Sequence, residues 1–437
     1  MASISGLLLL DCVAALVFIL TLTLYFIFHT ANSRLPPGPP SLPVVGNLFN
    51  VPTQEPWKVY ARWSKKYGDL MSVCILGKTT VIVNSVKAVK DLFERRGAVY
   101  SERPVVPIFE SDMMALHDWS YGMFPTNHRW RRGRKISEQA MRPEAVQNYW
   151  PILEVKAHQF LSKVLQSPTS FRELIRYSAG STILLLLYGY DAESLDDDFL
   201  SLAEDFMDAV NKVILPGAVL VNVFPLLKYL PSWLPGMGFK TSAARCKEVG
   251  YRARQRGYDY VKERMAEGTA RPSFVRDLLE SSQEADDDNP LMNDDQTIID
   301  SVGTLYGPGA DTTVSALSVF FLALSLNPKV QDKAQEELDR VVGDGRLPTF
   351  HDRAFLPYVE AVYKETLRWM PPVPLWRHLS DSSVWIVIAS VLYSLRIASA
   401  KDEICQETAG RFTDTIVSHP EAFNCTIMPR NEHVKNS

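Results

Sequence analysis

Hydrophobic residues follow three patterns along the chain, and each pattern predicts a different kind of element. Residues 6–28 are almost entirely apolar, with Asp11 as the one acid, which matches the roughly 20 residues that a helix needs to cross a bilayer. Residues 35–43 are rich in proline, which excludes a helix and indicates a stiff extended hinge. Residues 44–437 repeat their apolar positions mostly at helical spacing. The sequence therefore predicts a membrane anchor over 1–34, a hinge, and one mainly α-helical domain with a small β region.

Periodicity also predicts individual elements of this domain. Strict alternation over 70–76 and 79–84, across Gly77-Lys78, indicates a β-hairpin. Helices are expected at 55–67, 144–165, 171–187, 197–213, 241–267, 293–326, 328–342 and 357–370. Residues 215–238 are apolar and broken by prolines, with Trp233 among them. They fit either a buried loop or a second contact with the membrane near the anchor.

The anchor has a rival interpretation as a cleaved signal peptide. Its apolar run is longer than the roughly 7–15 residues of a signal peptide, and no cleavage site of small residues follows it. His29 and Arg34 lie after the span and no basic residue precedes it, so the following domain is expected in the cytosol. The glycosylation sequon at Asn424 would then stay unmodified.

Composition changes this picture little. Hydrophobic residues make up 46% of the 437 residues, enough for a sizeable core. The net charge of −4 gives no electrostatic reason to expect a nucleic-acid partner. The five cysteines have no Cys-x-x-Cys spacing, which is typical of neither a zinc site nor a disulfide framework and suits a reducing compartment.

The expected helix at 293–326 contains a polar pair that needs an explanation. Asp311 and Thr312 stand in a run otherwise fit for burial, which costs several kcal/mol unless they have partners or a function. Gly309 removes a side chain nearby, and Pro308 removes a backbone donor, so the helix is expected to bend or open into a groove that delivers protons. The alternative is a break between two ordinary helices with Asp311 as an N-cap. The pattern alone does not separate the two.

Two further residue pairs carry weaker signals. Glu365 and Arg368 are spaced to form an ion pair on a helix with apolar neighbours. Trp130 and Arg134 fall on one face of a helix within the cationic run 129–135, where together they suit an acidic ligand group. Taken alone, the run is better explained as a solvated basic face or a docking surface for an acidic partner.

Taken together and in order, these features resemble the microsomal cytochrome P-450 family of haem-thiolate monooxygenases, in its fungal-type branch. The resemblance rests on the anchor and hinge, Trp130-x-x-x-Arg134, the motif of residues 309–313, and Glu365-x-x-Arg368. It covers nearly the whole chain and implies the cytochrome P-450 fold, incomplete and carried on an N-terminal transmembrane helix.

The resemblance also implies roles for the motif residues. Trp130 and Arg134 would bind a haem propionate, Asp311 and Thr312 would relay protons to the oxygen, and Gly309 would leave room for the oxygen and the haem face. Glu365 and Arg368 would lock the proximal part of the fold, and residues 105–124 would help to line the substrate pocket. Pro308 departs from the small residue that the family usually has at this position.

One part of the family pattern is missing. In the family, several dozen residues follow the Glu-x-x-Arg helix, supply it with a third partner, an arginine, and end in the loop Phe-x-x-Gly-x-Arg-x-Cys-x-Gly. Here residues 371–376 lead directly into Arg377-His378-Leu379-Ser380. Residues 377–399 resemble the helix that follows the cysteine, and 410–431 resemble the closing strands. We therefore predict an internal deletion with its seam near 375–378.

This deletion predicts two losses. Cys405 and Cys425 lie beyond the relevant helix, so the chain has no axial cysteine and no metal ligand is assigned; without the thiolate, oxygen activation is expected to fail. Glu365 and Arg368 lose their third partner, and an incomplete buried ion network destabilises a fold by about 3–5 kcal/mol.

The function implied is a monooxygenase that oxidises a hydrophobic small molecule, in secondary metabolism or as a xenobiotic. Its cofactor is haem and its electrons come from NADPH through a reductase. The chain is expected in the endoplasmic reticulum membrane, facing the cytosol, with its activity lost or severely impaired. The alternatives are a non-catalytic, membrane-anchored binding protein and a truncated gene product.

Overall fold

The computed structural model describes residues 17–19, 35–52, 54–123, 125–213, 219–284, 294–372, 378–399, 411–413, 415 and 417–430. The chain divides into two compact units, Met1–Glu102 and Arg103–Ser437. Apart from a helical stretch at 17–19, the predicted membrane span at 6–28 lies outside the described residues. The residues at the predicted seam, 375–377, and the connector at 285–293 lie outside them too.

The first unit is built around a β-hairpin. Its elements are α2 (Pro56–Tyr67), β1 (Leu70–Ile75), β2 (Lys78–Val83), α3 (Val86–Val89), the π-helix η1 (Lys90–Glu94) and α4 (Gly97–Tyr100). The antiparallel register pairs Leu70 with Val83 and Ile75 with Lys78. The turn residues Leu76 and Gly77 have φ of 48° and 80°, because a two-residue hairpin turn that matches the strand twist needs positive φ at both positions. The predicted helix and hairpin are confirmed, with the turn one residue earlier than expected.

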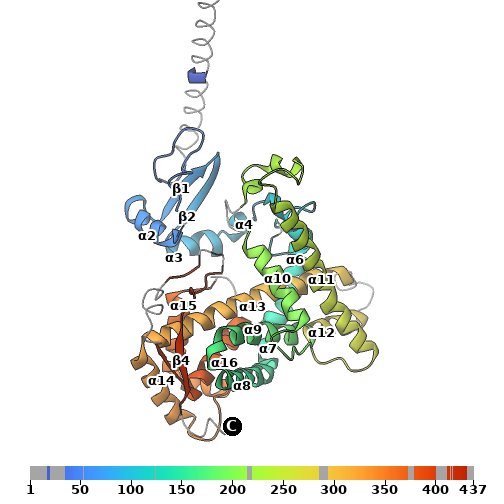
Figure 1. Cartoon of the computed structure of the whole chain (residues 1–437), viewed down its shortest axis with the longest axis vertical. Coiled ribbons are helices and arrows are strands. Elements are labelled where there is room, and N and C mark those ends of the chain that lie inside the picture. Colours follow the sequence, from blue (N-terminus) through green and yellow to red (C-terminus); the bar gives the residue numbers. More distant parts are fainter. Residues whose placement is uncertain are drawn as a thin grey trace, which may run out of the picture. The chain divides into compact units, whose positions relative to one another are not determined.

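The second unit is mainly helical (Figure 1). Its α-helices are α5 (Leu116–Trp119), α6 (His128–Met141), α7 (Pro143–Asn148), α8 (Trp150–Gln166), α9 (Phe171–Tyr188), α10 (Asp198–Asn211), α11 (Phe239–Ala266), α12 (Phe274–Glu284), α13 (Asp295–Leu326), α14 (Pro328–Val341), α15 (Pro357–Trp369) and α16 (His378–Ser394). Short 3-10 helices are η2 (Pro107–Phe109), η3 (Pro168–Ser170), η4 (Leu220–Asn222), η5 (Pro225–Tyr229) and η6 (Phe350–Phe355), and two strands, β3 (Leu395–Ser399) and β4 (Cys425–Pro429), pair antiparallel. The predicted helical class is thereby confirmed.

The core of this unit lies around α13, which packs against α9 and α16, while α8 covers α9 and α16 in turn (Figure 1). Phe321 of α13 is fully buried, and its ring centre lies 5.3 Å from that of Phe171 and 6.4 Å from that of Phe160. Burying one such side chain stabilises the fold by about 1.5–3 kcal/mol. Among the described helices, α13 alone is long and apolar enough to cross a membrane, and 72% of its apolar window is buried inside the protein. It is therefore the core helix of this unit.

Buried amides explain where α16 ends. The helix predicted over 377–399 stops at Ser394, and Leu395–Ser399 forms β3 instead. The Gln331 side chain of α14 donates to the Ile397 carbonyl and accepts from its amide, at 3.1 and 2.9 Å, as a neighbouring strand would. Since β4 pairs with the other edge, both edges of β3 are satisfied. The prediction of a continuous helix was wrong because these partners are distant in sequence.

Two other expectations need correction. The helix predicted over 144–165 is two helices, α7 and α8, because Pro151 starts a new helix at its first turn. The described part of 215–238 is not a buried loop, since Leu226 and Trp233 are 77% and 78% exposed. Its interpretation as a membrane contact stays a prediction.

Candidate functional site

Asp311 and Thr312 lie in the middle of α13 and make separate contacts. One oxygen of the Asp311 carboxylate is 3.1 Å from Nε2 of His419, and the other accepts from the Asn211 amide at 3.3 Å. The Thr312 hydroxyl donates to the Pro308 carbonyl at 2.6 Å. Both residues are nearly buried, so these contacts offset the cost of removing an acid and an alcohol from water.

The structure excludes one of the two interpretations of this region. The helix α13 continues without a break from Asp295 to Leu326, with Pro308 inside it and Asp294 as its N-cap. The alternative of a capped break at Asp311 is therefore wrong. Pro308 leaves the Thr304 carbonyl without its usual helical amide partner, because proline has no N–H. The proton-delivering role of Asp311 and Thr312 stays a prediction.

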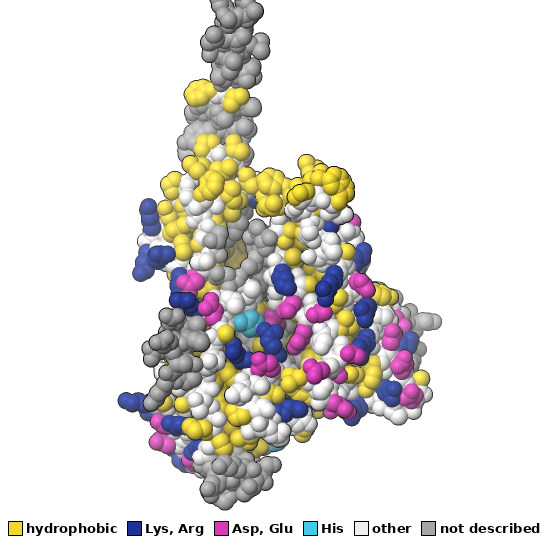
Figure 2. Space-filling model, viewed as in Figure 1, with side chains coloured by type: hydrophobic (Ala, Val, Ile, Leu, Met, Phe, Trp, Pro, Cys, Tyr) yellow, Lys and Arg dark blue, Asp and Glu magenta, His cyan; other side chains and the backbone are white. Residues whose placement is uncertain are grey.

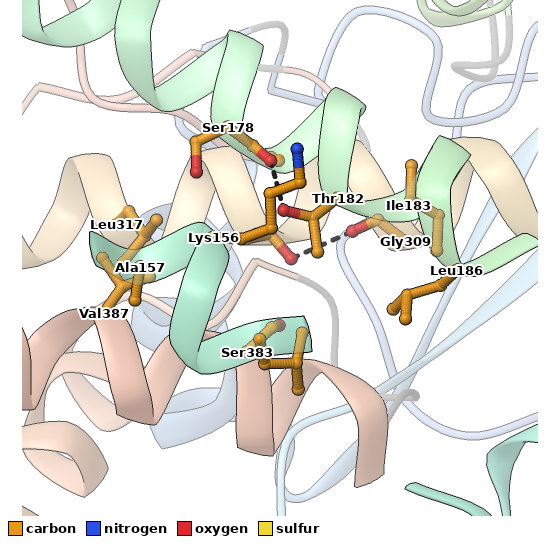
Figure 3. Close-up of a pocket in the computed structure, with 13 residues that line it drawn as sticks. Lys156, Ala157, Ser178, Thr182, Ile183, Leu186, Gly309, Leu317, Ser383 and Val387 are labelled. Atoms are coloured by element: carbon orange, nitrogen blue, oxygen red, sulfur yellow. Dashed lines mark hydrogen bonds between the residues drawn. The ribbon is translucent and has the colours of Figure 1, made fainter. Parts of the chain in front are cut away.

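Gly309 allows a close approach between helices. A Cβ at this position would lie 2.7 Å from Cδ1 of Ile183 on α9, which no real side chain tolerates without movement. Figure 3 shows Ile183 beside Gly309 at a cavity of about 30 Å³, room for a water molecule. Lys156 also lines it, with its ammonium 2.6 Å from the Asp191 carboxylate. The contact observed for Gly309 is thus with α9.

Trp130 and Arg134 lie together on α6, as the helical spacing predicts. The Arg134 guanidinium carbon is 5.6 Å from the centre of the Trp130 ring. The Asn127 side chain caps the helix by accepting from the Trp130 amide at 2.9 Å. Trp130 packs partly buried against the core and Arg134 is exposed. The pair therefore presents a cation, backed by an aromatic ring, to a ligand that arrives from the solvent side.

Glu365 and Arg368 form the expected pair on α15, but at the surface. Two hydrogen bonds of 2.6 Å join them, and they hold the pKa of the Glu365 carboxyl below its usual value. Their side chains are 61% and 71% exposed. The expectation that this pair belongs to a buried and incomplete ion network is wrong, because solvent screens both charges.

A different charge network ties α15 to α16. The Arg353 guanidinium of η6 binds the Asp381 carboxylate at 2.6 and 3.1 Å and the Glu360 carboxylate at 3.0 and 3.4 Å. It also lies 5.1 Å from the Trp385 ring centre and 5.5 Å from that of Tyr363. This Arg353 network was not found in the sequence, where its members are up to 28 residues apart.

The structure describes three of the five cysteines, each within a helix or a strand. Cys246 on α11 is 1% exposed, and burial raises the pKa of its thiol to about 12. Cys74 and Cys425 are half-buried in β1 and β4, while Cys12 and Cys405 lie outside the described residues. No group of three or more histidine, cysteine and acidic side chains in the described ranges is placed to hold a metal ion. The propionate role of Trp130 and Arg134 and the lack of an axial cysteine both stay predictions.

The segment expected to line a substrate pocket is mixed in its burial. Ile108, Phe109 and Met114 are buried, in a cluster with Val210 of α10 and residues of η4 and α11. Val105 is exposed. Pocket lining by residues 105–124 stays a prediction.

Comparison with known proteins identifies the family. Residues 36–384 match the family model described as Cytochrome P450. Cytochrome P450 monooxygenase 208 of Postia placenta is 38% identical over 370 residues, covering 84% of this chain and 70% of the relative. Cytochrome P450 monooxygenase claR of Ampulloclitocybe clavipes is 38% identical over 496 residues (94% and 90%), and monooxygenase 176 of Postia placenta is 32% identical over 498 (96% and 95%). The chain belongs to the cytochrome P450 family of haem-dependent monooxygenases.

Proposed function

We propose that this chain is a haem monooxygenase for a hydrophobic small molecule that has lost the loop bearing the thiolate ligand of the iron. The observation that carries the proposal is the direct passage from Trp376 to Arg377-His378-Leu379, without the cysteine loop between them. The alignment lengths support it, since the 496 positions aligned with claR exceed the 437 residues of the chain by 59. At least 59 residues of that relative therefore face no residue here.

The remaining residues keep the roles that the resemblance implies. Arg134 and Trp130 would bind a propionate, Asp311 and Thr312 would relay protons to the oxygen, and Gly309 would leave room for the oxygen and the haem face. Haem with a thiolate ligand supplies the electron density that cleaves dioxygen. Under this proposal the chain keeps the residues that bind haem and deliver protons, and it lacks the anionic ligand of the iron. We therefore expect the chain to bind its substrate without oxidising it.

The electron donor is a redox partner, as in the rest of the family, and we propose an NADPH-dependent reductase. The exposed side chains of Arg131, Arg134 and Lys135 give α6 a cationic surface. Such a surface raises the encounter rate with an acidic partner and is sensitive to salt. Oxidation in secondary metabolism is our proposal for the pathway, by likeness to the fungal relatives.

Sequencing the genomic DNA and the transcript across codons 375–378 tests the proposed seam. We expect genomic sequence between these codons that encodes a Phe-x-x-Gly-x-Arg-x-Cys-x-Gly loop in frame. Codons that follow one another directly in the genome, with no such sequence between them, would contradict a loss by splicing or exon assignment.

We propose that the protein is anchored in the endoplasmic reticulum membrane by residues 6–28, and that the second unit makes its own membrane contact. An apolar patch is exposed between α10 and α11, where Figure 2 shows hydrophobic side chains gathered over the segment drawn yellow-green in Figure 1. We define this apolar patch as Leu220, Phe224, Leu226, Tyr229, Leu230 and Trp233. Large exposed apolar patches are typical of interaction sites.

Replacing Leu226 and Trp233 together by serine is expected to weaken binding to lipid vesicles about 100-fold, measured by flotation of the chain from residue 35 onward. Each side chain loses at least about 1.5 kcal/mol of apolar burial, and about 1.4 kcal/mol corresponds to a tenfold change. Leu195→Ser is the matched control, because Leu195 is 46% exposed outside the patch. Equal binding of the double variant and the control would contradict the contact.

The sequon at Asn424 reports the orientation of the domain. Asn424 is exposed just before β4, so a glycosylating enzyme could reach it if the domain entered the lumen. With the domain in the cytosol, we expect no change in gel mobility after treatment with a glycosidase, and the same mobility for Asn424→Gln. A mobility shift that Asn424→Gln abolishes would contradict the cytosolic orientation.

A further inference from the structure

The carboxylate of Asp311 is held from two elements that are far apart in the sequence. Asn211, the last residue of α10, binds one oxygen, and His419 binds the other from the segment that precedes β4. These partners are 100 and 108 residues away from Asp311, so neither contact follows from the geometry of α13 itself. The orientation of the carboxylate is therefore set by tertiary structure.

The position of His419 is itself well determined. Two hydrogen bonds join Thr413 to the backbone of His419: the Thr413 amide donates to the His419 carbonyl at 2.8 Å, and the Thr413 hydroxyl accepts from the His419 amide at 3.0 Å. The Ser315 hydroxyl, one turn after Asp311 on α13, donates to the Ser418 carbonyl at 2.5 Å. Ser418 is thus bound to the same helix that carries the acid, which places the imidazole of the next residue, His419, beside the carboxylate.

Thr312 does not share this arrangement. Its hydroxyl donates to the Pro308 carbonyl, while the Asp311 carboxylate contacts His419 and Asn211. Of the two side chains that contact the Asp311 carboxylate, a histidine imidazole can accept and release protons, whereas the Asn211 amide cannot. The His419 side chain is 18% exposed and that of Asp311 is 13% exposed, so the imidazole is the member of the pair nearer to solvent.

We propose that His419 is the positioning residue of Asp311, which fixes its carboxylate and connects it to solvent. In the proton step, Nδ1 of His419 takes up a proton from hydronium in the solvent, and the resulting imidazolium passes the proton on Nε2 to the Asp311 carboxylate, which leaves a neutral imidazole and a protonated acid. This inference rests on the proposed role of Asp311 as a proton relay. The contact itself does not depend on haem or on the missing thiolate.

Asn211 provides a reporter, because its side-chain amide donates to the Asp311 carboxylate, the group that His419 contacts from the other oxygen. The full chain in detergent micelles, labelled with ¹⁵N at asparagine and histidine, allows both side chains to be followed by NMR. We expect His419→Ala to shift the Asn211 side-chain amide resonance, and His419→Gln, which keeps a donor, to restore most of its position. Asp311→Asn should shift the imidazole resonances of His419. His351→Ala, an exposed histidine on η6, is the control and should leave Asn211 unchanged.

An Asn211 resonance that His419→Ala leaves in place would overturn the proposal, as would a His419→Gln variant that behaves like His419→Ala. If His419→Ala does not fold, the response of His419 to Asp311→Asn decides alone, and an unchanged imidazole overturns the proposal. All these readings are taken without haem, so they remain valid if the proposed loss of the thiolate is wrong.

Discussion

Inserting a cysteine loop of the family at the proposed seam is expected to give the chain the monooxygenase activity that, under our proposal, it lacks. The insert is the stretch of claR that includes this loop, placed between Trp376 and Arg377. The loop brings the anionic ligand that iron needs to cleave dioxygen, while Asp311 and Thr312 are already in place on α13. We expect product formation with NADPH and a reductase to rise from undetectable to measurable. Haem at 100 times its dissociation constant would also stabilise the fold by about 2.7 kcal/mol.

The matched control for the insertion carries the same loop with its cysteine replaced by alanine. It restores the length and packing of the loop without the thiolate. We expect it to remain inactive and to show no thiolate-type spectrum. Equal activity of the two insertions would contradict the thiolate explanation, and inactivity of both would mean that the rest of the site does not support catalysis.

Replacing Arg353 by alanine is expected to lower the free energy of unfolding by about 3 kcal/mol or more. The substitution leaves Asp381 and Glu360 facing one another without the cation that binds both, and removing one partner of a buried network costs about 3–5 kcal/mol. The Arg353 side chain is 23% exposed, which places the expected loss at the lower end. Chemical denaturation followed by circular dichroism measures this loss.

Arg368→Ala is the control for Arg353→Ala, because it breaks a solvent-exposed arginine–carboxylate pair on α15, the helix that also carries Glu360. We expect this variant to have the same free energy of unfolding as the parent chain, since exposed ion pairs contribute little to stability. A loss for Arg368→Ala as large as that for Arg353→Ala would contradict the assignment of the structural network to Arg353.

The hydrophobic pattern predicted those helices and strands whose structure depends on residues close to one another in the sequence. The alternation at 70–84 gave a hairpin, and the long apolar run at 293–326 gave α13 within two residues of its start. The pattern failed at Leu395–Ser399, where Gln331 of α14 and the strand β4 decide the structure. It also failed at Glu365 and Arg368, because apolar neighbours in sequence do not reveal which face of a helix is covered.

The sequence motifs predicted only those contacts of the candidate site that join residues close in sequence. Trp130 and Arg134 pair because they are one turn apart on one helix. His419 carries no comparable signal, since its contact with Asp311 spans 108 residues and no periodicity links them. Arg353 was missed for the same reason, because its partners become neighbours only when η6, α15 and α16 pack together.

The carbon monoxide difference spectrum of the reduced, haem-supplemented full chain tests the central claim most directly. Carbon monoxide binds the reduced iron, and the position of the Soret band depends on whether the opposite ligand is a thiolate. Our account predicts no band at the thiolate position, whether or not haem is retained. A strong band at that position would show that a cysteine of this chain ligates the iron, and would contradict the proposed loss.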